Sequence, residues 1–216
     1  SIQIFEDKVP LTIFQPIIDF TNKNYRDMTR KVLFTVIAIL AAGTLLLNGQ
    51  TTAVSASDVI MSGYSVKSFS ADPVSDGNLE TILRCGMKAP SARNSQPWRF
   101  TVVRNDELIS EVLRGPAPGN VLVIISGTED KEVGMFVDYD CGLATQNMYI
   151  AAQSLGLGAH IYASPIANIN SKKESYGIPE GFRAVAVLRI GNIDKGVDAV
   201  SSASPRKTYE EIVNFK

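Results

Sequence analysis

The spacing of apolar and polar residues predicts a helix in the first half of the chain. Its apolar face combines residues three and four positions apart, namely Leu79, Ile82, Leu83 and Met87. Ser75 or Asp76 is suited to cap its first turn, because either side chain can accept a hydrogen bond from a free backbone N–H. We expect this helix to end near Lys88, since Pro90 disfavours helical backbone in the residue before it.

Beyond this helix the pattern alternates between strands and helices. Residues 121–126 form a β-branched run without polar alternation, so we expect a strand that is buried on both faces. The longest helical repeat covers residues 135–155, and its apolar side is predicted to contain Phe136, Tyr139, Leu143, Met148, Ile150, Ala151 and Leu155. Gly156 and Gly158 are expected to end it in left-handed conformations. The other predicted elements are strands at 99–104, 160–163 and 182–190 and a short helix at 107–113. This mixture indicates a layered α/β or α+β domain.

The longest apolar run lies near the N-terminus and is interpreted as an export signal. Val32–Leu47 carries no charge and follows Met28 and the two cations Arg30 and Lys31. A start methionine, cations and an apolar stretch are typical of a secretory signal peptide. We therefore predict a signal peptide at 28–56, cleavage before Ser57, and an exported (periplasmic or secreted) protein.

Two other interpretations of this run remain open. It is shorter than the roughly 20 apolar residues that a membrane-spanning helix needs, but the uncharged stretch continues to Ser57, so an uncleaved, tilted membrane anchor is possible. A buried core helix is the third interpretation. Residues 1–27 lie upstream of the predicted start and are interpreted as a non-native or disordered segment. Residues 57–216 then form one domain.

Composition and charge narrow the function classes. The 216 residues are 45% hydrophobic and 20% charged, with a net charge of −1, which excludes collagen, low-complexity disorder and a disulfide-dense mini-protein. The near-zero charge argues against a nucleic-acid partner, which requires a basic face. Cys85 and Cys141 fall within apolar helical patterns, so we favour buried free thiols over a disulfide.

Few side chains are suited to demanding chemistry by themselves. His160 is the single histidine, and its place at the start of a predicted strand favours a structural role. The sequence offers no Ser-His-Asp set and no metal-ligand cluster, so no catalytic side chain and no metal site are predicted. If the protein is an enzyme, we expect a cofactor to supply the reactivity.

The most informative segment is a loop between the first helix and the first strand. Residues 89–100 read APSARNSQPWRF, and they are rich in small residues with hydrogen-bonding groups. Small residues let the backbone approach a flat ligand, and Ser and Asn supply donors and acceptors. The alternative interpretation is a simple connector in which Trp98 anchors the core.

Four segments in order along the chain resemble the nitroreductase family. The loop is similar to that family's flavin-binding pattern P-S-x-x-N-x-Q-P-W-x-F, which residues 90–100 match. Residues 140–158 resemble the family's central helix and the glycines that follow it. The segment SVKSF at 65–69 resembles the opening motif, and Pro205-Arg206-Lys207 followed by residues 210–213 resembles the C-terminal motif.

The resemblance implies an α+β fold: a three-layer α/β/α sandwich around a mixed, mainly antiparallel sheet, in a homodimer with FMN at the interface. It also implies an oxidoreductase in which NAD(P)H delivers hydride to flavin N5 and a nitroaromatic, quinone or similar acceptor then takes the electrons in a ping-pong cycle. The flavin carries the chemistry, and the membrane is a partner only if the N-terminal segment is uncleaved.

The resemblance also assigns cofactor-binding roles to individual residues. Ser65 would bind the FMN phosphate, and Lys67 would lie near the flavin's pyrimidine edge or the phosphate. Pro165 and Ile166 match the segment that passes flavin N5. Arg206, with Lys207, would pair with the phosphate, as suits a dianion. The loop residues that would reach the flavin from the other subunit are Pro90, Ser91, Ala92 and Asn94.

The chain departs from the family pattern at three places, one of which is a short segment between Leu113 and Val121. Gly63 and Tyr64 stand where the opening motif carries an arginine two residues before the serine, so one phosphate-binding cation is missing. Ala167 and Asn168 replace an acidic residue and a glycine. Two other functions therefore stay open: a flavin-binding protein with little turnover (storage, sensing or partner binding), and an enzyme of the same fold with other flavin chemistry, such as dehalogenation. Tyr162 is expected either to stack on the ring or to pack in the core.

Overall fold

The computed structural model describes residues 25–31, 35, 55–115, 118–197 and 205–216. The chain divides into two units, Ser1–Ala53 and Val54–Lys216. In the first unit, residues 25–31 and Thr35 are helical. Most of the predicted upstream segment 1–27 and signal peptide 28–56 lie outside the described residues, so both stay predictions. None of the helices in the described ranges is long and apolar enough to cross a membrane.

The second unit is built on a four-stranded sheet with the strand order β1-β2-β4-β3, and every pairing is antiparallel. The strands are β1 (Trp98–Val103), β2 (Val121–Thr128), β3 (Gly158–Tyr162) and β4 (Phe182–Gly191). These agree with the four predicted strands and with a mainly antiparallel sheet. β2 is buried from Val121 to Gly127, as its unbroken apolar run predicts.

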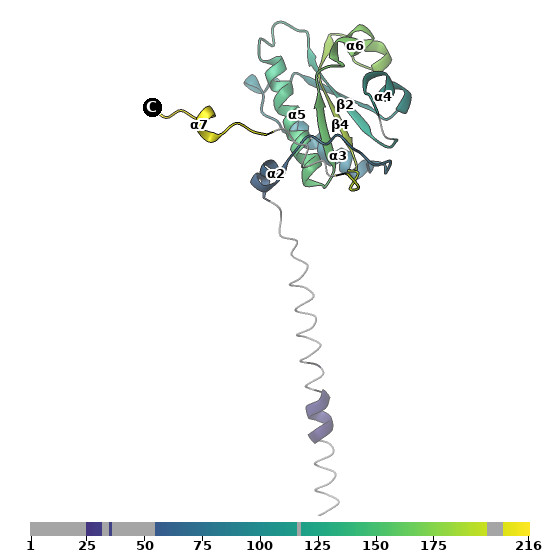
Figure 1. Ribbon diagram of the computed structural model, residues 1–216, viewed down its shortest axis with the longest axis vertical. Coiled ribbons are helices and arrows are strands. Elements are labelled where there is room, and N and C mark those ends of the chain that lie inside the picture. Colours follow the sequence, from purple (N-terminus) through teal and green to yellow (C-terminus); the bar gives the residue numbers. More distant parts are fainter. Residues whose placement is uncertain (1–24, 32–34, 36–54, 116–117, 198–204) are drawn as a thin grey trace, which may run out of the picture. The chain divides into compact units, whose positions relative to one another are not determined.

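Helices cover both faces of this sheet and complete the three predicted layers (Figure 1). On one face lie α3 (Asp76–Met87) and α5 (Val137–Ser154), which pack on each other and enclose the larger apolar core. The second core lies on the other face, beneath α4 (Asp106–Val112), α6 (Ile166–Ser171) and the 3-10 helix η3 (Lys173–Tyr176). The remaining short elements are α2 (Ala56–Ser62), η2 (Ala92–Asn94) and α7 (Tyr209–Ile212). The predicted α+β fold class is confirmed.

Local sequence signals explain where the predicted helices begin. Ser75 caps α3, because its hydroxyl accepts a hydrogen bond from the N–H of Asn78 at 3.3 Å. Asn105 caps α4 in the same way, accepting from the N–H of Leu108 at 2.9 Å. α2 begins at Ala56, so the bond before Ser57, where cleavage is predicted, lies in the first turn of that helix.

Two predictions for the end and the faces of α5 are wrong. Gly156 is left-handed, with a φ of 74°, but Gly158 is the first residue of β3. A Cβ at Gly158 would lie 3.0 Å from the side chains of Phe69 and Val66, so this glycine permits close packing and not a turn. The predicted apolar side is also divided: Met148 and Ala151 are buried, whereas Phe136, Tyr139 and Leu155 are exposed.

Candidate cofactor-binding site

The segment containing Ser65 and Lys67 is fixed along β3, the edge strand of the sheet. Val66 is 1% exposed, its N–H donates to the carbonyl of Ala159 at 3.1 Å, and its own carbonyl lies 2.8 Å from Nδ1 of His160. Because Val66 points into the core, the neighbouring Ser65 and Lys67 are both exposed. A hydroxyl and an ammonium group are therefore presented from one anchored stretch of extended backbone. His160 has the structural role that its isolation in the sequence predicts.

Phe69 anchors the other end of this segment. It pairs with Ile193 in an isolated antiparallel bridge, and its ring lies 4.1 Å from the guanidinium carbon of Arg189. Arg189 is itself 2% exposed and donates to Oδ1 of Asn120 at 2.6 Å. A buried arginine needs such partners to offset its desolvation. The stretch from Val66 to Phe69 is thus held at both ends.

Gly63, where the family pattern carries an arginine, lies against Gln153 of α5. A Cβ at Gly63 would come within 2.5 Å of Oε1 of Gln153 and 3.1 Å of the Val59 carbonyl oxygen. Gln153 is held there because its Nε2 donates to the carbonyl of Tyr64 at 3.0 Å. Gly63, Tyr64 and Gln153 also line a cavity of about 370 Å³. Where the family pattern has a cation, the neutral side-chain amide of Gln153 therefore lies against the backbone.

The loop at residues 90–96 is the second group of predicted site residues. Pro90 and Asn94 are exposed, and Ser91 and Ala92 are half-buried. Arg93, Asn94 and Gln96 have left-handed backbone, with φ of 54°, 55° and 47°, a conformation that is uncommon outside glycine. The hydroxyl of Ser91 accepts from the N–H of Gln96 at 3.0 Å, so it shapes the loop as well as being available to a ligand. The nearby Trp98 is 6% exposed and packs in the core, as predicted.

The two groups of residues contact opposite ends of α5. Asp140, near the start of the helix, accepts from the N–H of Ala92 in the loop. Gln153, near its end, contacts the residue next to Ser65. These two helix positions are thirteen residues apart, or roughly 20 Å along the axis. Within one copy of the chain, the loop and the Ser65–Lys67 segment therefore do not converge on one site.

Pro165 and Ile166 lie where β3 gives way to α6. Pro165 is buried as the residue that caps α6, and Ile166 is half-buried as its first residue. Tyr162, just before them, is half-buried and stacks on His160 with ring centroids 4.2 Å apart. Both of its predicted placements, against a ligand and in the core, are compatible with this position.

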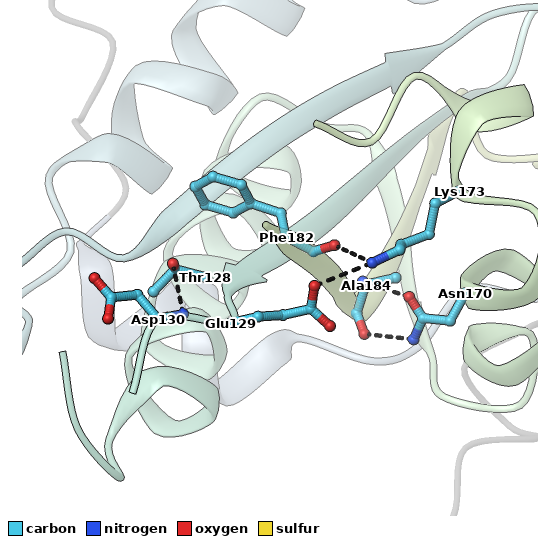
Figure 2. Close-up of polar contacts among 7 residues, drawn as sticks. All are labelled: Thr128, Glu129, Asp130, Asn170, Lys173, Phe182 and Ala184. Carbon is cyan, nitrogen blue, oxygen red and sulfur yellow. Dashed lines mark hydrogen bonds and ion pairs between the residues drawn. The ribbon is translucent and has the colours of Figure 1, made fainter. Parts of the chain in front are cut away.

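Asn170 and Lys173 fix α6 and η3 to the part of β4 that β3 leaves unpaired (Figure 2). The side chain of Asn170 donates to the carbonyl of Ala184 at 3.1 Å and accepts from its N–H at 2.8 Å. It thus forms the two hydrogen bonds that a neighbouring strand would form. Lys173 donates to the carbonyl of Phe182 at 2.9 Å and to Glu129 at 3.1 Å. These contacts determine where α6, and with it Pro165 and Ile166, lies on the sheet.

Arg206 and Lys207 are exposed in the segment that leads into α7. No hydrogen bond or ion pair of theirs is found among the described residues. Their side chains are accessible to an anion, but neither is brought to Ser65 or Lys67 by a direct contact.

The two cysteines are unpaired, as predicted. Cys141 is a fully buried residue of α5, and burial, together with the charge of the nearby Asp138, raises the pKa of its thiol to about 12. Cys85 is half-buried. A thiol with such a raised pKa is protonated and unreactive at neutral pH, so Cys141 belongs to the core and not to the site.

Comparisons with known proteins agree with this architecture. The sequence profile of the Nitroreductase family matches residues 60–118. A protein of Archaeoglobus fulgidus, named "Putative NADH dehydrogenase/NAD(P)H nitroreductase", is 32% identical over 145 residues, which cover 62% of this chain and 82% of the relative.

Solved structures share the fold. A nitroreductase with bound FMN from Bacteroides fragilis aligns with a TM-score of 0.62 at 19% identity, over 75% of this chain and 98% of that one. A nitroreductase with bound FMN from Desulfitobacterium hafniense aligns with a TM-score of 0.62 at 22% identity, over 74% and 97%. With the profile match, the relative and the shared fold in agreement, this chain belongs to the nitroreductase family.

Proposed function

We propose that this protein is an FMN-dependent oxidoreductase that uses NAD(P)H to reduce nitroaromatics, quinones or similar conjugated acceptors in a ping-pong cycle. The observation that carries the proposal is the anchored segment around Val66, which presents Ser65 and Lys67 together at the sheet edge. The names of the relatives, which include NAD(P)H nitroreductase, and the FMN bound in the structural neighbours support it.

The exposed donors suit FMN. A phosphate dianion favours cations and hydroxyl donors, and Ser65, Lys67, Arg206 and Lys207 are all exposed. We assign the phosphate to these residues and the flavin ring to Pro165, Ile166 and the loop residues Pro90, Ser91, Ala92 and Asn94. When bound, FMN supplies hydride acceptance and electron transfer. The protein's own residues hold and orient it; if Lys67 lies at the pyrimidine edge and not at the phosphate, its cation favours negative charge on that side of the ring.

We further propose that each site is shared between two copies of the chain in a homodimer. The loop and the Ser65–Lys67 segment contact opposite ends of α5, a separation that one mononucleotide does not bridge. Along the outer side of α5 and α3, several large apolar side chains are more than half exposed: Met87 at 58%, Phe136 at 52% and Tyr139 at 66%. In the proposed dimer a second copy covers these side chains, and its loop completes the site at the first copy's Ser65.

A subunit-mixing experiment tests the shared site. Lys67→Ala and Asn94→Ala each damage one half of it, so each homodimer should lose most of its NAD(P)H oxidation. After subunit exchange, half of the sites in a mixed dimer carry both substitutions and the other half carry neither. Activity should therefore recover in the mixture. If the mixture is only as active as its parents, the site lies within one copy.

A flavin spectrum with an NAD(P)H titration tests the activity itself. The purified chain, after reconstitution with FMN, should show a flavin absorption band that NAD(P)H bleaches and an acceptor restores. A chain that takes up no FMN overturns the proposal. The identity of the restoring acceptor, followed by product analysis, separates nitro and quinone reduction from other flavin chemistry such as dehalogenation.

A second candidate is a flavin-binding protein with little turnover, for storage, sensing or partner binding. It is favoured by Gly63, where the cation of the family pattern is absent and Gln153 occupies the space. Under this alternative FMN binds, but the protein does not oxidise NAD(P)H with any acceptor.

We also propose that the protein is exported, by a signal peptide at 28–56 or, if that segment is not cleaved, as a membrane-anchored protein. The uncharged run Val32–Leu47 behind Arg30 and Lys31 carries this proposal. Mass spectrometry of the mature N-terminus tests it, since a chain that retains Met28 in the soluble cell fraction would contradict export.

A further inference from the structure

The loop at residues 90–96 is shaped by bonds within itself. The N–H of Asn94 donates to the carbonyl of Ser91, and the N–H of Ser95 donates to the carbonyl of Ala92, both at 3.0 Å. Arg93 and Gln96 adopt a left-handed backbone conformation, which residues other than Gly, Asn and Asp rarely adopt. These local bonds give the loop its curvature, but they do not attach it to the rest of the protein.

One side chain of α5 provides that attachment. The two carboxylate oxygens of Asp140 lie 3.2 and 3.1 Å from the N–H of Ala92, at the middle of the loop. Among the described residues this is the single hydrogen bond that joins residues 90–96 to another element. The loop is thus tied to the long helix at one point.

Asp140 has few other ways to satisfy its charge. Asp140 is only 2% exposed, and it takes part in none of the ion pairs found among the described residues. A buried carboxylate is costly unless donors surround it, and its place in the first turns of α5 adds favourable interaction with the helix dipole. The N–H of Ala92 is therefore a partner that Asp140 holds strongly.

We propose that Asp140 is a positioning residue that keeps loop 90–96 in its ligand-binding shape before FMN arrives, an inference that rests on the proposed function. Holding the left-handed residues in place in the free protein lowers the ordering cost of binding. Asp140 acts through the loop and does not touch the ligand. Its replacement should loosen the loop and weaken FMN binding while leaving the fold intact.

Trypsin cleavage after Arg93 reports the loop without any flavin. Arg93 is exposed at the tip of the loop, and the FMN-free full chain is the substrate. Asp140→Asn keeps the size of the side chain but replaces a charge-assisted bond with a weaker neutral one, so the fragment ending at Arg93 should appear about tenfold faster. Asp138→Asn is the matched control, because it removes the same charge from the same helix at an exposed position that pairs with Arg183. Equal cleavage rates in the three proteins would overturn the proposal.

FMN affinity is measured by quenching of flavin fluorescence. It should change only if Asp140 positions the loop for the cofactor, and not if its role is merely structural. Asp140→Asn should bind FMN about tenfold more weakly than both the wild type and Asp138→Asn, with an unchanged melting temperature. If cleavage accelerates but FMN affinity does not change, the attachment does not serve the cofactor and the proposal is wrong. A wild type that binds no FMN defeats the proposed function, and the cleavage rates still decide whether Asp140 holds the loop.

Ala92→Pro provides a second route if Asp140→Asn does not fold. It removes the N–H that Asp140 binds and leaves the carboxylate in place. Ser91 has φ −143° and ψ 155°, which is the backbone that a following proline prefers. Faster cleavage after Arg93 together with weaker FMN binding is again expected, and unchanged values for both would refute the inference.

Discussion

Asn170→Ala should destabilise the protein by more than the loss of one ordinary side-chain hydrogen bond. The substitution removes both hydrogen bonds between the Asn170 side chain and Ala184, at 3.1 and 2.8 Å. Ala184 is fully buried, so its N–H and carbonyl lose their partners without gaining water. Two net hydrogen bonds at about 1 kcal/mol each, with the added cost of unpaired buried groups, give a loss of about 2–4 kcal/mol.

Thermal and urea unfolding of the full chain measure this loss. A domain of this size should lose roughly 4–16 °C of melting temperature, with the urea midpoint falling in proportion. Asn168→Ala is the control, because Asn168 is exposed on the same helix and its side chain has no partner among the described residues. Asn170→Asp, which keeps the acceptor but loses the donor toward Ala184, should lose at least as much as Asn170→Ala.

The reasoning is refuted if Asn170→Ala and Asn168→Ala have the same midpoint. In that case the end of β4 would be stabilised by its pairing with β2 alone, and the position of α6 would not depend on this amide.

Four further predictions concern the core and the cofactor site. A thiol reagent at neutral pH should modify Cys85 and leave Cys141 untouched until the protein unfolds, because burial raises the pKa of Cys141 to about 12. For the same reason the wild type, compared with Cys141→Ala, should lose up to about 1.4 kcal/mol of stability per pH unit between pH 9.0 and about 12, since the unfolded thiol ionises first. Met148→Ala should cost about 2–5 kcal/mol in urea unfolding, because Met148 is fully buried; the exposed Met61→Ala should change little. Lys67→Ala should weaken FMN binding about tenfold in a fluorescence titration without changing the melting temperature, and unchanged affinity would remove Lys67 from the site.

The parts of the fold that sequence patterns predict are those stabilised by local signals. α3 follows from a repeat of apolar residues and a serine cap, and β2 follows from a β-branched run that is buried from Val121 to Gly127. In both cases the pattern and the burial coincide over a few consecutive residues. The order of these elements was then sufficient to indicate a layered α+β domain.

One element that escaped prediction, α6, is stabilised by a distant partner. α6 is six residues long and has one buried side chain, Ile169, so its sequence carries no helical repeat. Its attachment comes from Asn170 and Ala184, which are fourteen residues apart. The exposed apolar residues in and beside α5 differ from the prediction because hydrophobicity does not distinguish a helix face that meets the core from one that is open to solvent.

The candidate site was found only in part from the sequence. The resemblance indicates its residues, but it does not indicate the shape of the loop. Arg93 and Gln96 have left-handed backbone, which Arg and Gln rarely adopt, so their residue types do not predict it. Asp140 did leave a signal, namely a carboxylate within an apolar helical pattern. Its meaning required the contact with Ala92, forty-eight residues earlier in the chain.

The packing of Gly63 against Gln153 makes the residue at one of these positions depend on the residue at the other. An arginine at position 63 would displace the Gln153 side chain and break its hydrogen bond to the Tyr64 carbonyl, on the segment that carries Ser65. The substitution alone would therefore disturb the residue next to the phosphate donor that it is meant to assist. Restoring the missing charge therefore requires the Gln153 side chain to move away from Tyr64 or to be replaced by a shorter one, so the two positions are expected to vary together among relatives.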